Sequence, residues 1–144
     1  MTKRLMAFVG AAGFATALLS AGCGNDTTTP ATTTPTKTSP VTETFTSIVS
    51  PLGAVSRSFT MTDAGTISVT LATAGPPSTV VMGLGLGYAV SPVGCSLTTV
   101  VNTAAGPGPQ ITTTADAGSY CVAILDLGNA PKTGINFSIS ILHP

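Results

Sequence analysis

From residue 41 onward, apolar and polar residues alternate in several separate segments. The clearest are residues 65–71 (GTISVTL), 78–88 (STVVMGLGLGY) and 134–142 (GINFSISIL). Successive side chains of a β-strand point to opposite faces, so the alternation predicts strands with one buried face. An amphipathic helix would need its apolar residues to recur every three to four positions. The pattern therefore restricts this part of the chain to β-structure.

Gly- and Pro-rich breaks separate these segments from five further strand candidates, of which residues 120–126 are the strongest. The candidates are residues 43–49, 55–61, 95–101, 110–114 and 120–126, and the breaks include SPLGA, TAGPPS, VSPVG, TAAGPGP and GNAPKTG. Beyond the N-terminal segment, no window has a convincing helical period. About seven or eight short strands with regular turn signals are typical of an antiparallel β-sandwich of roughly 100 residues. The expected fold class is therefore all-β.

The sequence Asp-Ala-Gly occurs twice, at residues 63–65 and 116–118, and each time an alternating segment follows. Aspartate in a turn bonds nearby backbone N–H groups, and glycine tolerates a positive φ. We therefore expect two hairpins with tight turns at equivalent corners of the sandwich, with Gly65 and Gly118 supplying the positive φ.

The first 22 residues have the layout of an export signal. Lys3 and Arg4 form a positive start, residues 5–19 are uncharged and mostly apolar, and small residues follow. The apolar stretch is short for a bilayer span, which needs about twenty residues. Residues 1–22 are therefore expected to be a signal peptide.

Residues 19–23 (LSAGC) resemble the lipobox of bacterial lipoproteins. In that family the cysteine thiol receives a diacylglycerol, cleavage follows just before it, and the new amino terminus is usually acylated, typically with palmitate. The resemblance implies lipidation of Cys23 and a membrane anchor, since each buried methylene contributes about 0.8 kcal/mol. Gly24 stands where an aspartate often signals inner-membrane retention, so the outer membrane is favoured in a cell that has one. The alternative is plain secretion, with cleavage near Ala21 or Gly22.

Residues 23–40 (CGNDTTTPATTTPTKTSP) form a low-complexity segment with eight threonines and three prolines. Such a segment has almost nothing to bury and cannot offset the entropy of ordering. It is expected to be a disordered, flexible tether, and Thr/Pro-rich stalks of this kind are sometimes O-glycosylated. Its extended reach is at most about 55 Å.

The charge content excludes some functions. Only 7% of the residues are charged and the formal net charge is zero, whereas nucleic-acid binding needs a basic patch. The GLGLG sequence at residues 83–87 is followed by Pro92 and Gly94 and not by the helix that a nucleotide-binding loop requires. We therefore expect no nucleic-acid partner and no cofactor.

Three cysteines are present, Cys23, Cys95 and Cys121. With Cys23 lipidated, an even pair remains in an oxidising compartment, where cysteines form disulfides. A Cys95–Cys121 bond would stabilise the fold by about 3 kcal/mol in the chain-entropy description. The alternative is a nucleophilic Cys121, which needs a base, and His143 is the only histidine.

A metal site has less support than the disulfide. Zinc sites use several Cys and His ligands, and too few remain here. Calcium takes six to eight oxygen ligands, and the least implausible set is Asp63, Asp116, Asp126 and Asn129. No metal is therefore expected, with this weak calcium set as the alternative.

The remaining prominent side chains have structural interpretations. Arg57 shares a strand face with apolar residues and is expected at a rim, with its aliphatic stem packed. The five aromatic residues in the sandwich are expected in the core rather than on a binding platform; they are Phe45, Phe59, Phe137, Tyr88 and Tyr120.

Four short segments resemble the bacterial pre-peptidase C-terminal domain: residues 58–60 (SFT), 64–67 (AGTI), 118–122 (GSYCV) and 137–141 (FSISI). The resemblance implies a jelly-roll-like β-sandwich that is non-catalytic, usually appended to secreted peptidases and sometimes linked to substrate or matrix binding. We expect no peptidase domain within these residues, so the usual context of that family is not transferred to this chain. The Cys95/Cys121 pair is not general in that family and points to a lipoprotein subgroup.

The expected organisation is a signal peptide (1–22), a tether (23–40) and a β-sandwich (41–144). The expected function is a lipid-anchored envelope protein, not an enzyme, whose sandwich binds a protein or glycan or has a structural role. One alternative is a secreted modulator or partner of a peptidase. The other is an enzyme whose site would combine Cys121, or Asp116 and Asp126, with His143.

Overall fold

The computed structural model describes residues 38–92 and 94–144, and this part of the chain forms strands without a helix. The strands are β1 (Val41–Val49), β2 (Ala54–Met61), β3 (Gly65–Gly75), β4 (Met82–Ala89), β5 (Cys95–Thr103), β6 (Ile111–Ala115), β7 (Gly118–Leu125) and β8 (Ile135–His143). Within these residues there is accordingly no helix that could cross a membrane. Every expected strand is present, so the all-β prediction is confirmed.

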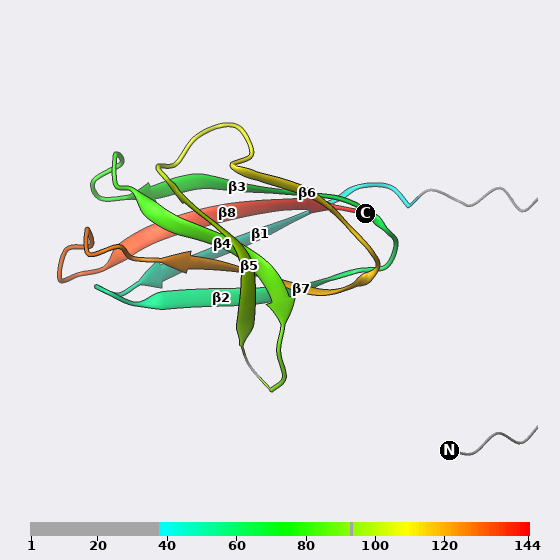
Figure 1. Cartoon of the computed structure of the whole chain (residues 1–144). Coiled ribbons are helices and arrows are strands. Elements are labelled where there is room, and N and C mark those ends of the chain that lie inside the picture. The colour runs from blue at the N-terminus through cyan, green and yellow to red at the C-terminus, as the bar shows by residue number, and fades with distance from the viewer. Residues whose placement is uncertain (1–37, 93) are drawn as a thin grey trace, which may run out of the picture. The chain divides into compact units, whose positions relative to one another are not determined.

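The strands form two antiparallel four-stranded sheets that face each other (Figure 1). Sheet A has the order β1-β8-β3-β6 and sheet B the order β2-β7-β4-β5. Only the β4–β5 connection stays within one sheet, and every other connection crosses to the opposite sheet. This order of eight strands is that of a jelly roll, which confirms the fold that the family resemblance implied.

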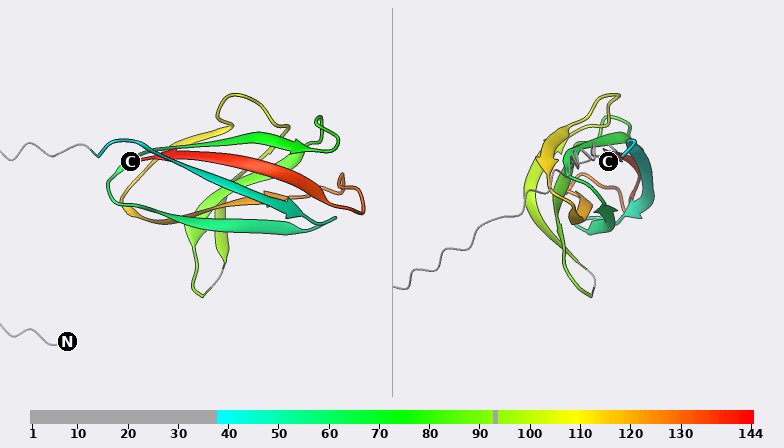
Figure 2. Two further views of the ribbon diagram at one scale, coloured as in Figure 1. Left: turned by 180° about the vertical axis from the view of Figure 1, so that it is seen from behind. Right: turned by 90° about the vertical axis from the view of Figure 1, so that its right-hand side faces the viewer.

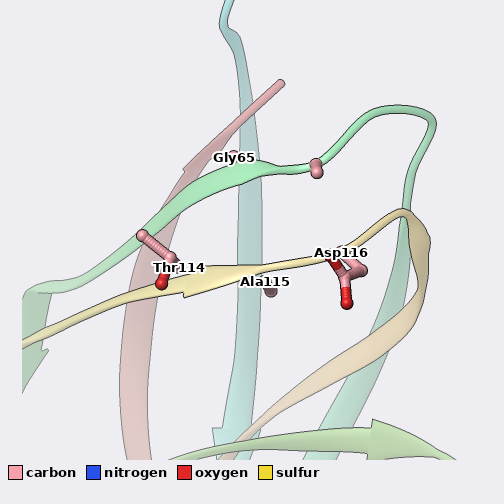
Figure 3. Close-up of a pocket in the computed structure, with 5 residues that line it drawn as sticks. Gly65, Thr114, Ala115 and Asp116 are labelled. Atoms are coloured by element: carbon pink, nitrogen blue, oxygen red, sulfur yellow. The ribbon is translucent and has the colours of Figure 1, made fainter.

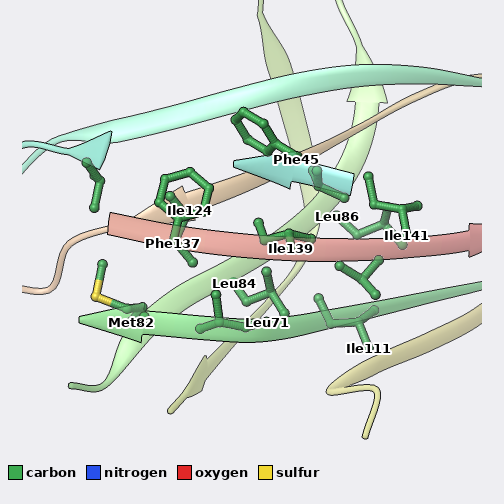
Figure 4. Packing of buried hydrophobic residues seen from close by; sticks show 14 of the residues in the cluster. Phe45, Leu71, Met82, Leu84, Leu86, Ile111, Ile124, Phe137, Ile139 and Ile141 are labelled. Atoms are coloured by element: carbon green, nitrogen blue, oxygen red, sulfur yellow. The ribbon is translucent and has the colours of Figure 1, made fainter. Parts of the chain in front are cut away.

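The core lies between the sheets and is made by the apolar half of each alternating strand. In β8 the buried residues Ile135, Phe137, Ile139 and Ile141 alternate with polar Asn136, Ser138 and Ser140. Figure 4 shows the side chains of both sheets meeting in this layer. Burial of apolar side chains contributes most of the stability of such a domain.

Two strands differ from their expected ranges for local reasons. Strand β3 continues to Gly75 because the register with β8 shifts between Leu71 and Thr73, which turns Ala74 into the core. A bulge of this kind adds one residue and restores the inward face. Strand β4 begins at Met82 because the N–H of Val80 bonds the Pro77 carbonyl in a turn.

The two Asp-Ala-Gly segments are not hairpins, contrary to expectation. Each connects a strand of one sheet to a strand of the other, β2 to β3 and β6 to β7, so each is an arch. The positive φ angles of glycine fall at Gly75, Gly128 and Gly134 instead of Gly65 or Gly118, because an arch crosses the core and needs no tight turn. The arches are equivalent corners, as expected, since β2 pairs with β7 and β3 with β6.

Both ends of the described chain lie beside these arches. Val41 of β1 pairs with His143 of β8, and Pro144 packs against Gly65. Figure 1 and the end-on view in Figure 2 place the C-terminus at this end, which we call the arch end. The β4–β5 hairpin projects from the body of the sandwich in the front and back views.

Candidate binding site

The expected disulfide joins Cys95 to Cys121, with their Cα atoms 5.6 Å apart. The bond connects β5 to β7, although β4 lies between them in sheet B. Two strands separated by a third are normally about 9–10 Å apart. The start of β5 must therefore fold across the outer face of β4 to reach β7.

The glycines of β4 make this crossing possible. A Cβ on Gly87 would overlap the carbonyl oxygen of Ser96 and lie 2.7 Å from the Cα of Leu97. A Cβ on Gly85 would lie 2.8 Å from a methyl carbon of Leu97. Gly85 and Gly87 of the GLGLG sequence thus form a side-chain-free surface that β5 of the same sheet covers, whereas Gly83 faces Leu125 and Leu127.

The disulfide uses the sulfur that a catalytic Cys121 would need, and His143 lies elsewhere. His143 is 4% exposed on the inner face of sheet A, with its ring 5.1 Å from that of Phe59. Its Nε2 is 3.3 Å from Glu43 Oε1 and its Nδ1 is 2.9 Å from the Pro144 oxygen. The structure therefore does not bring Cys121 and His143 together as a nucleophile and base.

Arg57 occupies the rim position expected of it. Its guanidinium donates a hydrogen bond to the Thr44 carbonyl (2.9 Å), lies 3.7 Å from Glu43 Oε2 and sits 6.0 Å from the centre of the Phe45 ring. Arg57 thereby connects the edge strands β1 and β2 of the two sheets. These contacts indicate that Arg57 has a structural role, which is to hold the edges of the two sheets together.

The four calcium candidates are split between the two ends of β7. Asp63 and Asp116 lie at the arch end, whereas Asp126 and Asn129 follow β7 at the opposite end. The amide of Asn129 donates to the Val81 carbonyl (3.0 Å). Among the residues of 38–144 that the structure describes, no three acidic, His or Cys side chains gather where they could hold a metal ion. These four residues, the alternative to no metal, therefore do not form one site.

Asp126 organises the loops at its end of the sandwich. Its carboxylate accepts the N–H groups of Leu52 (2.8 Å), Asn129 (2.9 Å) and Ala130 (3.0 Å). These bonds hold the pKa of Asp126 below its usual range, and the bond from Leu52 has the largest effect. Burial acts in the opposite direction but is outweighed. Leu52 has φ 55°, a conformation that non-glycine residues adopt rarely, and the bond to Asp126 helps fix it.

We expect this carboxylate to make stability fall in acid. Because the folded-state pKa is lowered, its contribution is complete above the unfolded value, about 3.9, and is lost as the pH falls through the folded value. Asp126→Asn should lower the urea midpoint at neutral pH and flatten its decline below about pH 4. The measurement is the urea midpoint as a function of pH.

The control is Asp63→Asn, which removes a carboxylate that accepts hydrogen bonds from the hydroxyls of Thr38 and Thr62. If the urea midpoint depended on pH with the same slope in both variants, the expectation would be contradicted.

Tyr88 was expected in the core, but the structure exposes it. Its side chain lies near the end of β4, on the same face of sheet B as Tyr120, and is 56% exposed. Its ring lies 5.4 Å from that of Tyr120 at an interplanar angle of 34°. The sequence contains one signal for this exposure, since Tyr88 comes just before the VSPVG break and so at a strand end.

The ring of Tyr120 packs against that of Tyr88 and is itself held in place. Its hydroxyl donates to the Asp116 carbonyl (2.8 Å), and its ring lies 6.0 Å from that of Phe59. Burial, then the neighbouring Tyr88 hydroxyl and the Asp116 carboxylate, raise the pKa of Tyr120. Tyr120 therefore contacts both Tyr88 and the backbone of Asp116 at the arch end, and we call these three residues the tyrosine site.

Asp116 also lines a shallow, open depression (Figure 3). Its lining comes from the first arch and from the end of β6, and consists of Ala64, Gly65, Thr114, Ala115 and Asp116. Asp116 thus belongs both to the depression and to the tyrosine site. Exposed aromatic surface next to a few polar groups is the usual composition of a ligand site.

The chain matches no family model and no curated protein. The expected signal peptide, Cys23 and most of the expected tether belong to residues 1–37, outside the described residues. Lipidation of Cys23 therefore remains a prediction from the sequence, whereas the disulfide is part of the described fold.

Proposed function

We propose that the chain is a lipid-anchored envelope protein whose β-sandwich is a non-catalytic binding module. The observation that carries this proposal is the structural use of the reactive side chains. Cys121 is in the disulfide, Asp126 accepts three backbone N–H groups and His143 is buried against Glu43. Tyr88, in contrast, presents its ring to solvent. Such a distribution suits binding better than bond-making chemistry.

The position of the tether is compatible with an anchored domain. The first described residues precede β1 at the arch end, so the tether joins the sandwich there. Its extended length, at most about 55 Å, exceeds that of the longest strand, whose eleven residues span about 36 Å. A tether of that length would let an anchored sandwich present any of its faces to a partner.

Fatty-acid labelling tests the anchor. The natural chain, expressed in a bacterium with the lipoprotein pathway, is expected to incorporate labelled palmitate and to fractionate with membranes. Cys23→Ser should abolish the label because the acceptor thiol is lost. As a matched control, Cys95→Ser should keep it. A mature protein without label, or one whose N-terminus is not residue 23, would contradict the proposal.

A further inference from the structure

We propose that the tyrosine site binds an organic ammonium group, held by the exposed ring of Tyr88 and the carboxylate of Asp116. This inference rests on the proposed binding role and names its ligand class. Its three components are the Tyr88 ring packed on Tyr120, the Asp116 carboxylate at the same end of the sandwich, and a shallow depression that Asp116 lines.

The aromatic component is fixed in advance of binding. Phe59, Tyr120 and Tyr88 form a series of rings with centroids 6.0 Å and 5.4 Å apart. The Tyr120 hydroxyl bond to Asp116 locks the middle ring. Tyr88 packs against this fixed ring, which reduces the freedom it loses when a ligand arrives and so favours affinity. The face of an aromatic ring attracts a cation through its quadrupole.

The charged component favours a cation over an anion. Asp116 lies at the site and Asp63 on the neighbouring arch, and each contributes a negative charge. Of the described cations, Arg57 is engaged with Glu43 and Phe45, and Lys132 lies in the loop at the opposite end. An ammonium group next to Tyr88 would gain attraction from both the ring and the carboxylate, whereas a phosphate or sulfate would be repelled.

The size of the site argues for a small ligand group. One exposed ring beside a shallow depression is far less than the roughly 800 Å² per partner that stable protein interfaces bury. The same chemistry occurs in a quaternary ammonium head group and in a lysine side chain. Both sources present an alkylammonium, and their affinities can be compared directly.

The composition of the chain supplies the readout. It contains no tryptophan and two tyrosines, which are Tyr88 and Tyr120, so intrinsic fluorescence reports on this site alone. The protein used is the unlipidated chain 24–144, which contains the whole core. It is titrated with choline chloride, tetramethylammonium chloride or butylammonium chloride, with sodium chloride at matched ionic strength and uncharged tert-butanol as controls.

We expect saturable fluorescence changes with the ammonium salts and none with sodium chloride or tert-butanol. Tyr88→Ala should raise Kd about two- to fivefold, as expected for the loss of a cation–π contact at an exposed site. Tyr88→Phe should keep the Kd of the natural protein because the ring remains. Asp116→Asn should raise Kd by a similar factor at low ionic strength. Amide chemical shifts of residues 116–120 give Kd for the variants that lack a tyrosine, and Leu142→Ala on sheet A serves as the matched control.

Choline binding more tightly than butylammonium would assign the site to quaternary head groups, and the reverse order to lysine side chains. No saturable change with any ammonium salt, or an unchanged Kd in Tyr88→Ala, would overturn the inference. Equal affinity for tert-butanol would overturn the ammonium assignment while leaving a binding role. None of these results affects palmitate labelling at Cys23, so failure of this inference is distinct from failure of the anchored function.

Discussion

Replacing both Cys95 and Cys121 by alanine is expected to lower the free energy of unfolding by about 3 kcal/mol. The bond joins two residues with a sequence separation of 26. Without this cross-link the unfolded chain has more conformational entropy, so unfolding becomes more favourable. Alanine at position 121 fits, because the site is buried beside small residues of β4 and β7. Urea denaturation of the two proteins measures the difference.

A reductant supplies the internal control for this experiment. Natural protein in reductant should approach the stability of the double variant, and the double variant should not respond to reductant. Amide exchange should then accelerate first in β5, since the bond fixes its start across β4. Equal stability of the natural protein with and without reductant would contradict the stabilising role.

Gly87→Ala is expected to destabilise the sandwich by about 3 kcal/mol, the upper part of the range for overpacking. The added methyl would overlap the backbone of Ser96 and approach the Cα of Leu97, and neither can move without displacing β5. A displaced β5 would also draw Cys95 away from Cys121. The expected result is a lower urea midpoint together with slower or incomplete disulfide formation. Alkylation of free thiols measures the disulfide formation.

Two glycines provide graded controls for this substitution. Gly108→Ala meets nothing within 4 Å and should be close to neutral. The atoms nearest to a Cβ on Gly85 belong to the flexible side chain of Leu97, which can rotate away, so the effect of Gly85→Ala should fall between the other two. If Gly87→Ala were as stable as Gly108→Ala, close contact between β5 and β4 would not be essential to the fold.

Much of the fold could be predicted because the core follows directly from alternation. A strand such as β8, with Ile139 and Ile141 on one side and Ser138 and Ser140 on the other, can bury only one face. Long-range geometry could not be predicted in the same way. Whether an Asp-Ala-Gly segment closes a hairpin or crosses between sheets depends on where its strands pair, and the pairing is not encoded within the segment itself.

The candidate site shows the same division. The Cys95–Cys121 bond could be expected from cysteine number and compartment, but its path across β4 depends on contacts made by Gly87 and Leu97. Tyr88 was misplaced because alternation puts it on the inner face, and it does point that way. Its exposure depends on what covers this end of β4 in the folded chain, which the sequence of a single strand cannot reveal.

The pairing of β1 with β8 has a consequence for how the domain can be rearranged. Val41 and His143 are partners across these strands, so a short linker could join the two ends of the sandwich without disturbing either sheet. New termini could then open at the exposed loop around Gly108, since chains with neighbouring ends tolerate circular permutation. The same proximity means that the sandwich could be inserted into a surface loop of another protein through a single point of attachment.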